Sequence, residues 1–308
     1  MKPASTKQTP WQEEARRIAR GIRRRALELT IEREGCYLSQ ALSSADILAV
    51  LYTRVINLGQ SQGPWLPPPF SGVPGDNRDA QSGAVYNGPQ EPDLDRFLIS
   101  AAHYAVAVYA ALVEVGRMAP EGLAYFNTDG STVEMIGAEH SPGYELTTGS
   151  FGQVMSQAGG VAMARRLHGD TGRVFVFMSD GEFQEGQTWE AVQAVAFYKL
   201  DNIIVYVDVN GQQVDGLTKE VMNIEPISAR LEAFGARVEE VDGHDVEALA
   251  AAAESHHGRD GTPLFVLAYT NPSQGIPLLD ERKPHLHFVR FKDEAEIERY
   301  KAFLQQMN

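Results

Sequence analysis

Polar residues that could bind a metal ion and a phosphate follow two apolar segments in the middle of the chain. Asp180 and Gly181 come just after the apolar segment 173–178, and Asn210 comes just after the apolar segment 202–208. Asp180 and Asn210 are 210 − 180 = 30 residues apart, which is one helix plus one strand. If the two segments are adjacent parallel strands, both residues lie at the carboxyl edge of the sheet, where open α/β folds bind their ligands.

A metal site built from these residues would suit a hard cation. Asp180 offers a carboxylate oxygen, Asn210 offers an amide oxygen, and the loop after Asn210 offers main-chain carbonyls. This set is too small for Ca²⁺, but it suits Mg²⁺ that takes its other oxygens from a diphosphate and from water. Gly181 would let the main chain approach those phosphates. Because an Asp-Gly pair after a strand is by itself typical of a turn, the interpretation depends on having two loops at matched strand ends.

The elements that must position these residues alternate along the chain. Short apolar segments separated by helical patterns are typical of a parallel sheet that is covered on both faces. The sequence therefore predicts an α/β fold with a doubly wound, mostly parallel sheet and helices on both faces. Strands are predicted at 96–100, 173–178, 202–208, 236–241 and 263–269, and helices from about 103 and at 152–167, 187–199, 227–234, 245–255 and 292–305.

Two helices and an irregular segment are predicted before this alternation. Apolar residues at helical spacing predict a first helix over 10–34, and we interpret the arginines between them as its solvent-exposed face. Ser43 or Ser44 is predicted to cap a second helix over 45–57 that is apolar nearly all round and therefore buried. The segment 58–95 has no sustained period, and both a functional excursion and a tolerated insertion fit it. We predict one diphosphate-binding domain over 1–308.

Composition excludes several classes of protein. The chain has 308 residues, of which 43% are hydrophobic and 22% are charged, as in ordinary globular proteins. A net charge of −14 makes nucleic acid and membranes poor partners, because both are anionic. The single cysteine, Cys36, allows no internal disulfide. Without an apolar leader or a long apolar span, we expect a cytoplasmic protein.

The segment 173–216 resembles the thiamine diphosphate motif, which begins with Gly-Asp-Gly and ends with Asn, and it is most similar to the motif of transketolases. The resemblance implies that Asp180, Asn210 and the main-chain carbonyl of Gln212 hold the metal ion, and that Gly181 and Glu182 are near the cofactor. It also implies that Glu185 orients the interface or the carboxylates around the cofactor. The matching residues are Asp180-Gly181-Glu182, Gln184-Glu185-Gly186, Trp189-Glu190-Ala191 and Asn210 to Gly216.

The segment 147–153 resembles the Thr-Thr-Gly-Pro-Leu-Gly-Gln segment of the same family. Main-chain amides at the start of a helix favour negative charge, and glycine lets them approach a phosphate. The resemblance therefore implies that Gly149, Ser150 and Phe151 bind the diphosphate.

Three histidines lie in segments that are similar to histidine motifs of transketolases. His103 follows Ser100-Ala101-Ala102, His140 lies in Glu139-His140-Ser141-Pro142, and His287 follows the last strand, with His285 as its rival. The resemblance implies that His103, His140 and His287 transfer protons and contact substrate hydroxyl groups, which suits a side chain that titrates near neutral pH. His244 follows Asp242-Gly243 and is interpreted as structural.

The main departure from the family pattern is at Cys36, which takes the place of a histidine in a segment similar to Ser-Gly-His-Pro-Gly. We expect this position to face the substrate, so that the thiol changes the choice of donor. Ser179 replaces the first glycine of the cofactor motif, which should be tolerated because the metal ligand is the next residue.

Taken together, the resemblance implies a diphosphate-binding subunit of a split transketolase, which transfers a two-carbon ketol unit from a ketose to an aldehyde. It implies thiamine diphosphate with Mg²⁺ or another divalent cation, and a second subunit that carries the pyrimidine-binding and C-terminal domains in an α2β2 assembly. Two alternatives stay open. One is another thiamine-dependent subunit, of an acyloin-forming or 2-oxo acid enzyme, and the other is a catalytically silent regulatory or scaffold subunit.

Overall fold

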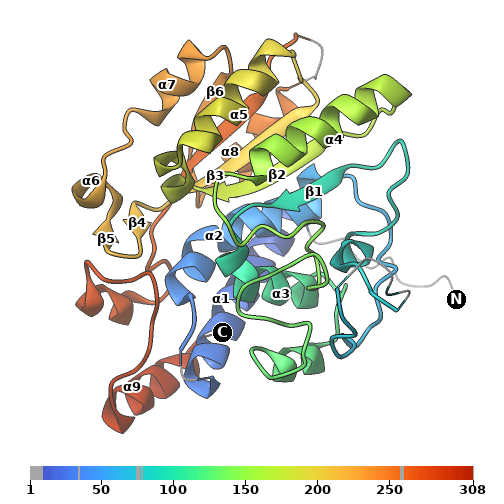
Figure 1. Cartoon of the computed structure of the whole chain (residues 1–308). Helices are drawn as coiled ribbons and strands as arrows, with labels where there is room; N and C mark the ends of the chain where they lie inside the picture. Colours follow the sequence, from blue (N-terminus) through green and yellow to red (C-terminus); the bar gives the residue numbers. More distant parts are fainter. Residues whose placement is uncertain (1–9, 34, 74–76, 78, 257–259, 308) are drawn as a thin grey trace, which may run out of the picture.

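A five-stranded parallel sheet forms the centre of the molecule, and its strands run in the order β1-β2-β3-β7-β6. The computed structural model in Figure 1 describes residues 10–33, 35–73, 77, 79–256 and 260–307. The predicted parallel sheet is confirmed, with each strand within one or two residues of its predicted bounds. The strands are β1 Arg96–Ile99, β2 Val174–Ser179, β3 Ile203–Val209, β6 Arg237–Asp242 and β7 Leu264–Tyr269.

Helices cover both faces of the sheet, as predicted, because alternate strand side chains enter two separate cores. Phe175 and Phe177 of β2 lie in the core beneath one group of helices, whereas Val174 and Val176 lie in the core on the opposite face. The first group consists of α1 Trp11–Glu32, α2 Leu38–Val50, α3 Ala105–Glu114 and α8 Val246–Glu254. The second group consists of α4 Val154–His168, α5 Gly186–Phe197 and α7 Ile227–Ala233.

The helix α2 is buried along its whole length, as predicted, but it begins earlier than expected. Its first residue is Leu38, so the prediction that Ser43 or Ser44 caps the helix is wrong. Both serines lie inside the helix, where the Ser44 hydroxyl donates to the carbonyl of Gln40 at 2.6 Å. A buried serine can be kept inside a helix in this way, because its hydroxyl bonds to the preceding turn.

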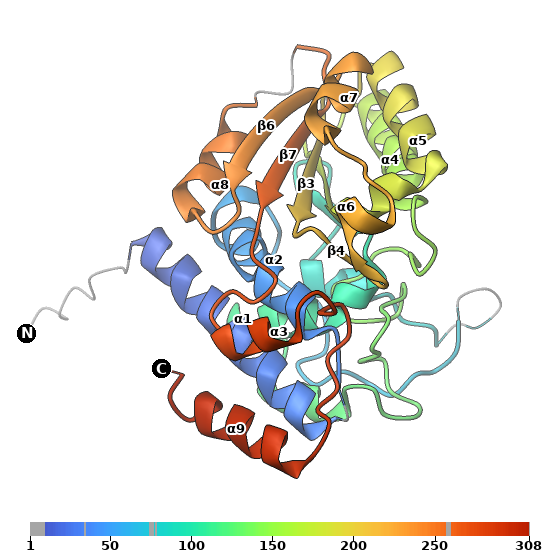
Figure 2. The same cartoon turned by 90° about the vertical axis from the view of Figure 1, so that its left-hand side faces the viewer.

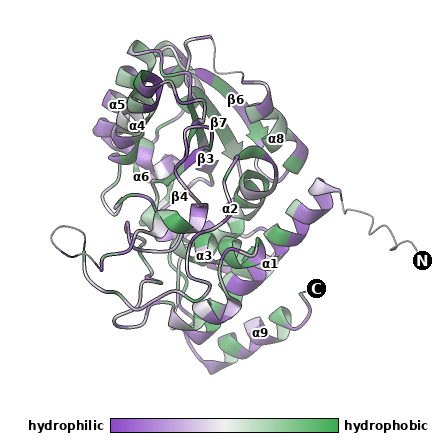
Figure 3. Ribbon diagram, turned by 90° about the vertical axis from the view of Figure 1, so that its right-hand side faces the viewer, coloured by the Kyte–Doolittle hydropathy of each residue, from purple (hydrophilic) through white to green (hydrophobic). Residues whose placement is uncertain are grey.

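The helix α1 exposes most of its arginines, but Arg23 is an exception to the predicted solvent-exposed face. Arg23 is 7% exposed, forms an ion pair with Asp46 of α2, and donates from Nε to the carbonyl of Leu42 at 3.1 Å. Figure 3 shows hydrophilic and hydrophobic segments alternating along α1. The buried pair therefore fastens α1 to α2 in the first core.

Smaller elements complete the chain around the sheet. The short strands β4 Gln212–Gln213 and β5 Gly216–Leu217 form an antiparallel pair after β3, and the short helix α6 Thr218–Val221 follows them. The last helix, α9 Glu294–Leu304, lies beside α1, as Figure 2 shows. In the described part of the chain, no helix is both long enough and apolar enough to cross a membrane.

The described residues of the irregular segment 58–95 are hydrogen-bonded to one another and to the chain that follows α3. Main-chain hydrogen bonds join Gln62 to Val85, Phe70 to Gly130, and Gly83 to Glu139. A short 3₁₀ helix, Gly83–Asn87, lies within it, and Trp65, Leu66 and Phe70 are exposed.

We predict that Asp46→Ala lowers the free energy of unfolding by about 3 kcal/mol, because it leaves the Arg23 guanidinium buried without its partner. Urea unfolding followed by circular dichroism would measure the change. Arg16→Ala is the matched control, since the Arg16–Glu247 ion pair has both side chains about half exposed and should cost under about 1 kcal/mol. Equal losses in the two variants would contradict this account of the α1–α2 contact.

Candidate active site

Asp180 and Asn210 lie together at the carboxyl edge of the sheet. Strands β2 and β3 are adjacent, with Ser179 opposite Asp208, so the loops that follow them meet. The carboxylate of Asp180 accepts hydrogen bonds from the amides of Gly181 and Gly211, each at 2.9 Å. The structure thus brings together the two side chains that the sequence places 30 residues apart.

The side-chain amide of Asn210 is oriented by a buried carboxylate behind it. Its Nδ2 donates to Asp208 Oδ2 at 3.0 Å and lies 3.0 Å from the hydroxyl of Tyr104. Its Oδ1 accepts from the amide of Gln212 at 2.9 Å, so the oxygen faces the loop after β3. Among the described residues, the buried Oε1 of Gln212 has no hydrogen-bond partner. Successive main-chain amides of this loop, at Gly211 and Gln212, therefore donate to the side chains of Asp180 and Asn210.

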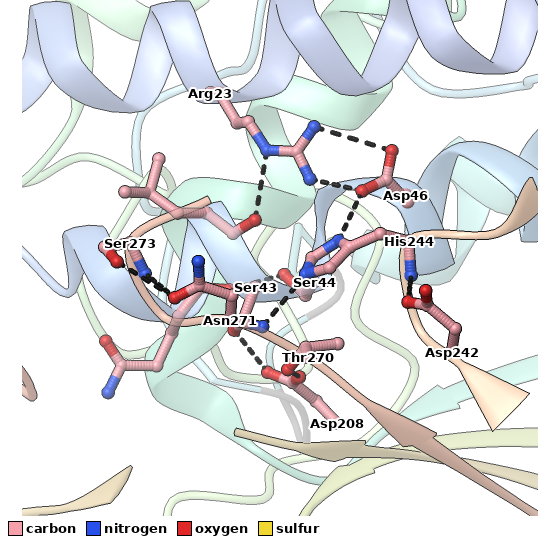
Figure 4. Close-up of polar contacts among 12 residues, drawn as sticks. Arg23, Ser43, Ser44, Asp46, Asp208, Asp242, His244, Thr270, Asn271 and Ser273 are labelled. Carbon is pink, nitrogen blue, oxygen red and sulfur yellow. Dashed lines mark hydrogen bonds and ion pairs between the residues drawn. The ribbon is translucent and has the colours of Figure 1, made fainter. Parts of the chain in front are cut away.

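The electrostatics of this edge favour a bound cation. Asp180 is 2% exposed, and burial together with the nearby charge of Asp208 raises its pKa to about 8. Burial also raises the pKa of Asp208, although Ser43, Tyr104, Thr270 and Asn210 all hydrogen-bond to its carboxylate. Figure 4 shows Ser43 and Thr270 beside Asp208. In the described ranges, no three His, Cys, Asp or Glu side chains are grouped to hold a metal, so a cation here would depend on amide and carbonyl oxygens as well.

A cavity of about 540 Å³ opens beside these oxygen atoms. Asp180 and Asn210 line it together with Thr218 and the lysines Lys219 and Lys283. This volume lies within the range of small-molecule sites. The cavity therefore adjoins the candidate metal ligands and has cationic side chains on its wall.

One buried glutamate supports the turn before α4, which adjoins the predicted diphosphate-binding residues 149–151. Gly152 has a φ of +79°, which favours glycine, and it ends the turn that precedes α4. Glu182 accepts from the Ser100 hydroxyl at 2.5 Å and from the amide of Ser179 at 3.3 Å. Burial raises the Glu182 pKa to about 7, although the amide of Gly152 also donates to its carboxylate. Glu182 is fully buried, so its carboxylate holds the ends of β1 and β2 to this turn and offers no surface to a ligand.

The remaining residues of the predicted cofactor set are more open. Gly149, Ser150 and Glu185 are exposed, and Phe151 is half-buried with its ring centroid 5.5 Å from that of His103. Glu185 precedes the first residue of α5, where the helix dipole stabilises a carboxylate. The loop 149–151 thus borders the pair of histidines described next.

Two of the three predicted histidines lie side by side. The ring centroids of His103 and His287 are 5.0 Å apart, and the ring of Tyr37 contacts both. Burial lowers the pKa of His103 to about 3 and that of His287 to about 4, so both rings are neutral near pH 7. His285 is exposed, so the geometry favours His287 as the late histidine of the site.

His140 has different contacts. Its Nε2 is 2.9 Å from Glu134 Oε2, and its ring lies 4.5 Å from that of Phe70. In the part of the chain that the structure describes, its buried Nδ1 has no partner. The amide of Gly137 donates to the carbonyl of Ala102 at 3.0 Å, which ties this segment to the loop that carries His103.

Cys36 is fully buried and faces the core. Its sulfur lies 2.8 Å from the hydroxyl of Thr30, and burial raises the thiol pKa to about 12. The expectation that the Cys36 side chain faces the substrate is therefore wrong. Its neighbour Tyr37 is the residue of this segment whose side chain contacts His103. The antiparallel bridge between Cys36 and Val289 leaves the thiol directed into the core.

A second polar cluster supports the chain after β7. In Figure 4, His244 links Asp46 of α2 to the segment that contains Asn271. His244 Nδ1 lies 2.8 Å from Asp46 Oδ2, and its Nε2 accepts from the amide of Asn271 at 2.9 Å. The contacts of His244 are structural, as its position in a turn suggests. They hold Thr270, which reaches Asp208, in place.

Sequence reasoning missed several residues that complete the site. Asp208 and Tyr104 orient Asn210, Tyr37 lies against the histidine pair, and Gln40 contacts His287. An acidic residue two positions before Asn210, at the end of a wholly apolar strand, was the available signal for Asp208. No local pattern singles out Gln40, because its partner lies 247 residues away.

Comparison with known proteins identifies the family of this chain. Residues 84–303 match the family model described as "Transketolase, thiamine diphosphate binding domain". A transketolase family protein of Sinorhizobium fredii, y4mO, is 36% identical over 88% of each chain. An apulose-4-phosphate transketolase subunit of Actinobacillus succinogenes is 31% identical over 92% of this chain and 94% of its own. The 6-deoxy-6-sulfo-D-fructose transketolase subunit SqwG of a Clostridium species is 29% identical over 87% and 89%.

Solved transketolases share the fold over nearly the whole chain. The enzyme of Leishmania mexicana superposes with a TM-score of 0.67 at 22% identity, covering 95% of this chain and 45% of its own. The enzyme of Campylobacter jejuni gives the same TM-score and identity, covering 96% and 46%. This chain thus spans under half the length of these solved enzymes.

The lowered histidine pKa values predict that the protein loses stability as the pH falls from about 6.5 toward 4. An unfolded histidine titrates near pH 6.5. In this pH window the unfolded chain therefore binds protons, whereas His103 and His287 stay neutral in the folded protein. The free energy of unfolding then decreases as the pH falls. Each histidine adds a slope of up to about 1.4 kcal/mol per pH unit. Urea unfolding at several pH values should show a shallower slope for His103→Gln than for the control His168→Gln, which changes an exposed residue. Identical slopes would count against a neutral, buried His103.

Proposed function

Because this chain belongs to the transketolase family and matches its thiamine diphosphate-binding domain, we propose that it is the diphosphate-binding subunit of a two-subunit transketolase. The observation that carries the proposal is the meeting of the loops after β2 and β3, where Asp180 and Asn210 lie beside the cavity. Relatives of nearly the same length are named as transketolase subunits, which supports a split enzyme.

The residues present fit a metal and a diphosphate. Asp180 is a carboxylate whose pKa is raised by burial and by the nearby charge of Asp208, so a bound cation would stabilise its charged form. Asn210 and the main chain at Gln212 offer neutral oxygens. In the proposed site, Asp180, Asn210 and the carbonyl of Gln212 hold Mg²⁺, which takes its other oxygens from the diphosphate and from water. The amides of Gly181 and of the turn 149–151 bind the diphosphate.

When bound, thiamine diphosphate supplies the nucleophilic carbon for the carbon–carbon bond chemistry, and the protein positions it and manages protons. His103 and His287 are neutral, so each can offer one N–H donor and one acceptor to bound oxygens. His140, which contacts Glu134 and whose Nδ1 has no partner among the described residues, is proposed to exchange protons with the substrate. The proposed reaction moves a two-carbon ketol unit from a ketose to an aldehyde.

A second subunit is required by this proposal. Relatives that this chain matches over most of their length are named as transketolase subunits, so the proposal assigns the pyrimidine-binding and C-terminal domains to a partner. Two cofactor sites related by symmetry would give an α2β2 assembly. The exposed Glu185, at the start of α5, is proposed to face the partner or the carboxylates around the cofactor. The whole chain, 1–308, is proposed to act as one diphosphate-binding domain.

We predict that Asp180→Ala abolishes Mg²⁺-dependent binding of thiamine diphosphate, because the metal and diphosphate charges are then left unbalanced in a partly dry site. Asn210→Ala should weaken binding less, since an amide oxygen carries no net charge. Isothermal titration calorimetry of each variant with its partner subunit would measure both effects, with Glu298→Ala on the exposed face of α9 as the control. Wild-type affinity in Asp180→Ala would refute the metal assignment.

We also predict that the purified chain alone shows no ketol transfer, because the pyrimidine pocket belongs to the second subunit. Mixed with that subunit, it should co-elute on size exclusion and transfer a ketol unit from a ketose to an aldehyde. A panel of phosphorylated and unphosphorylated sugars would then identify the substrates. Turnover by the single chain would contradict the split-enzyme proposal, and a complex that binds cofactor without turnover would indicate a silent subunit.

A further inference from the structure

Tyr37 lies against both histidines of the pair at the candidate site. Its ring centroid is 5.1 Å from that of His103 and 5.4 Å from that of His287, with interplanar angles of 61° and 83°. The ring of Phe288 also packs on it, with the centroids 5.2 Å apart and the planes at 84°. All three contacts are edge-to-face, an arrangement that aromatic rings favour. Three neighbours therefore restrict the ring of Tyr37 to one place beside the histidines.

The main chain on either side of Tyr37 is also fixed. Cys36 exchanges main-chain hydrogen bonds of 3.1 and 2.9 Å with Val289, and Leu38 is the first residue of α2. Cys36 and Leu38 are fully buried, whereas Tyr37 keeps part of its surface exposed. The chain thus directs Cys36 and Leu38 into the core and directs Tyr37 toward the histidine pair.

The hydroxyl group of Tyr37 is not used within the protein. The hydroxyl groups of the buried Tyr104, Tyr144 and Tyr206 all donate hydrogen bonds to other residues. In the described part of the chain, no residue hydrogen-bonds to the hydroxyl of Tyr37, and burial alone raises its pKa. The group therefore keeps its proton at neutral pH and is available to a ligand.

We propose that Tyr37 is a substrate-binding residue whose hydroxyl group forms a hydrogen bond with a hydroxyl group of the sugar. A neutral phenol both donates and accepts hydrogen bonds, as a sugar hydroxyl does, but it carries no charge to offset that of a phosphate. The segment that begins α2 thus contributes a polar contact through Tyr37, although the side chain of Cys36 faces the core. The proposal rests on the proposed function for the presence of a sugar beside the histidine pair.

This contact makes Tyr37 a determinant of substrate choice. Its ring is restricted by three neighbours, so its hydroxyl matches only sugars that place a hydroxyl group at one position relative to His103 and His287. A site that hydrogen-bonds a substrate hydroxyl discriminates against the analogue that lacks it. The effect of removing the Tyr37 hydroxyl should therefore depend on which hydroxyl groups the sugar carries.

Tyr37→Phe tests the contact, because it removes the hydroxyl group and keeps the ring packing. The full-length variant is assembled with the partner subunit, Mg²⁺ and thiamine diphosphate. Values of kcat/KM are then measured for ketose donors and aldehyde acceptors, and for analogues that each lack one hydroxyl group. The variant should lose about fivefold in kcat/KM for the parent sugar, the effect of one neutral hydrogen bond. One deoxy analogue should be used equally well by variant and wild type, because it has no such bond to lose.

Tyr198→Phe is the matched control, since it removes the hydroxyl group of a half-exposed tyrosine that follows α5. It should leave kcat/KM unchanged for every sugar, and circular dichroism verifies that both variants fold. The same loss in Tyr37→Phe for every sugar, deoxy analogues included, would overturn the proposal, because Tyr37 would then act on the site without binding a hydroxyl group.

Failure of this proposal can be told apart from failure of the proposed function. If the wild-type complex transfers a ketol unit and Tyr37→Phe matches it on every sugar, the role of Tyr37 alone is overturned. If the wild-type complex transfers no ketol unit from any donor, the proposed function fails, and the role of Tyr37 fails with it.

Discussion

Burial of the Asp208 carboxylate at the end of β3 is the constraint on which the rest of the site depends. A carboxylate with no exposed surface must be satisfied by hydrogen bonds, and the donors to Asp208 come from four different parts of the chain. Ser43 comes from α2, Tyr104 from the start of α3, Thr270 from the end of β7, and Asn210 from the loop after β3. These segments converge on one atom group, and their convergence fixes the direction in which Asn210 presents its oxygen.

The sheet and its ligand-binding edge could be predicted from the sequence because both follow from short-range patterns. The uncharged segments 174–178 of β2 and 203–207 of β3 indicate strands buried on both faces, and in parallel strands the residues after them meet at one edge. Asp180 and Asn210 are found together for this reason. The length of a continuous apolar segment and the position of its end carry this information without any knowledge of tertiary contacts.

Errors occur where a side chain's direction depends on a distant partner. Arg23 has the spacing of a solvent-exposed residue, but it is buried in an ion pair with Asp46. Cys36 matches the position of a functional histidine, but its pairing with Val289 turns the thiol toward Thr30. In both cases the local pattern is correct about the element and wrong about the side chain, because hydrogen bonds across long sequence separations decide the outcome. Motif correspondence therefore locates a segment of the site more securely than it assigns a role to each residue.

The charges at the proposed site explain why a cofactor here would depend on a divalent cation. The chain has a net charge of −14, Asp180 and Asp208 are both buried at the edge, and a diphosphate would add further negative charge. The histidines that border the site, His103 and His287, are neutral by burial and contribute N–H dipoles rather than charge. Helix N-termini and glycine amides contribute partial charges only. Neutral donors can orient a diphosphate but do not offset its charge. The cavity wall also carries Lys219 and Lys283, but Lys283 is paired with Asp280 and the acidic Glu225 lines the same wall, so these side chains offset only part of the negative charge beside Asp180. A divalent cation coordinated by Asp180 supplies the remaining positive charge at the point where the repulsion is greatest, so in the proposed site metal and cofactor bind as one unit.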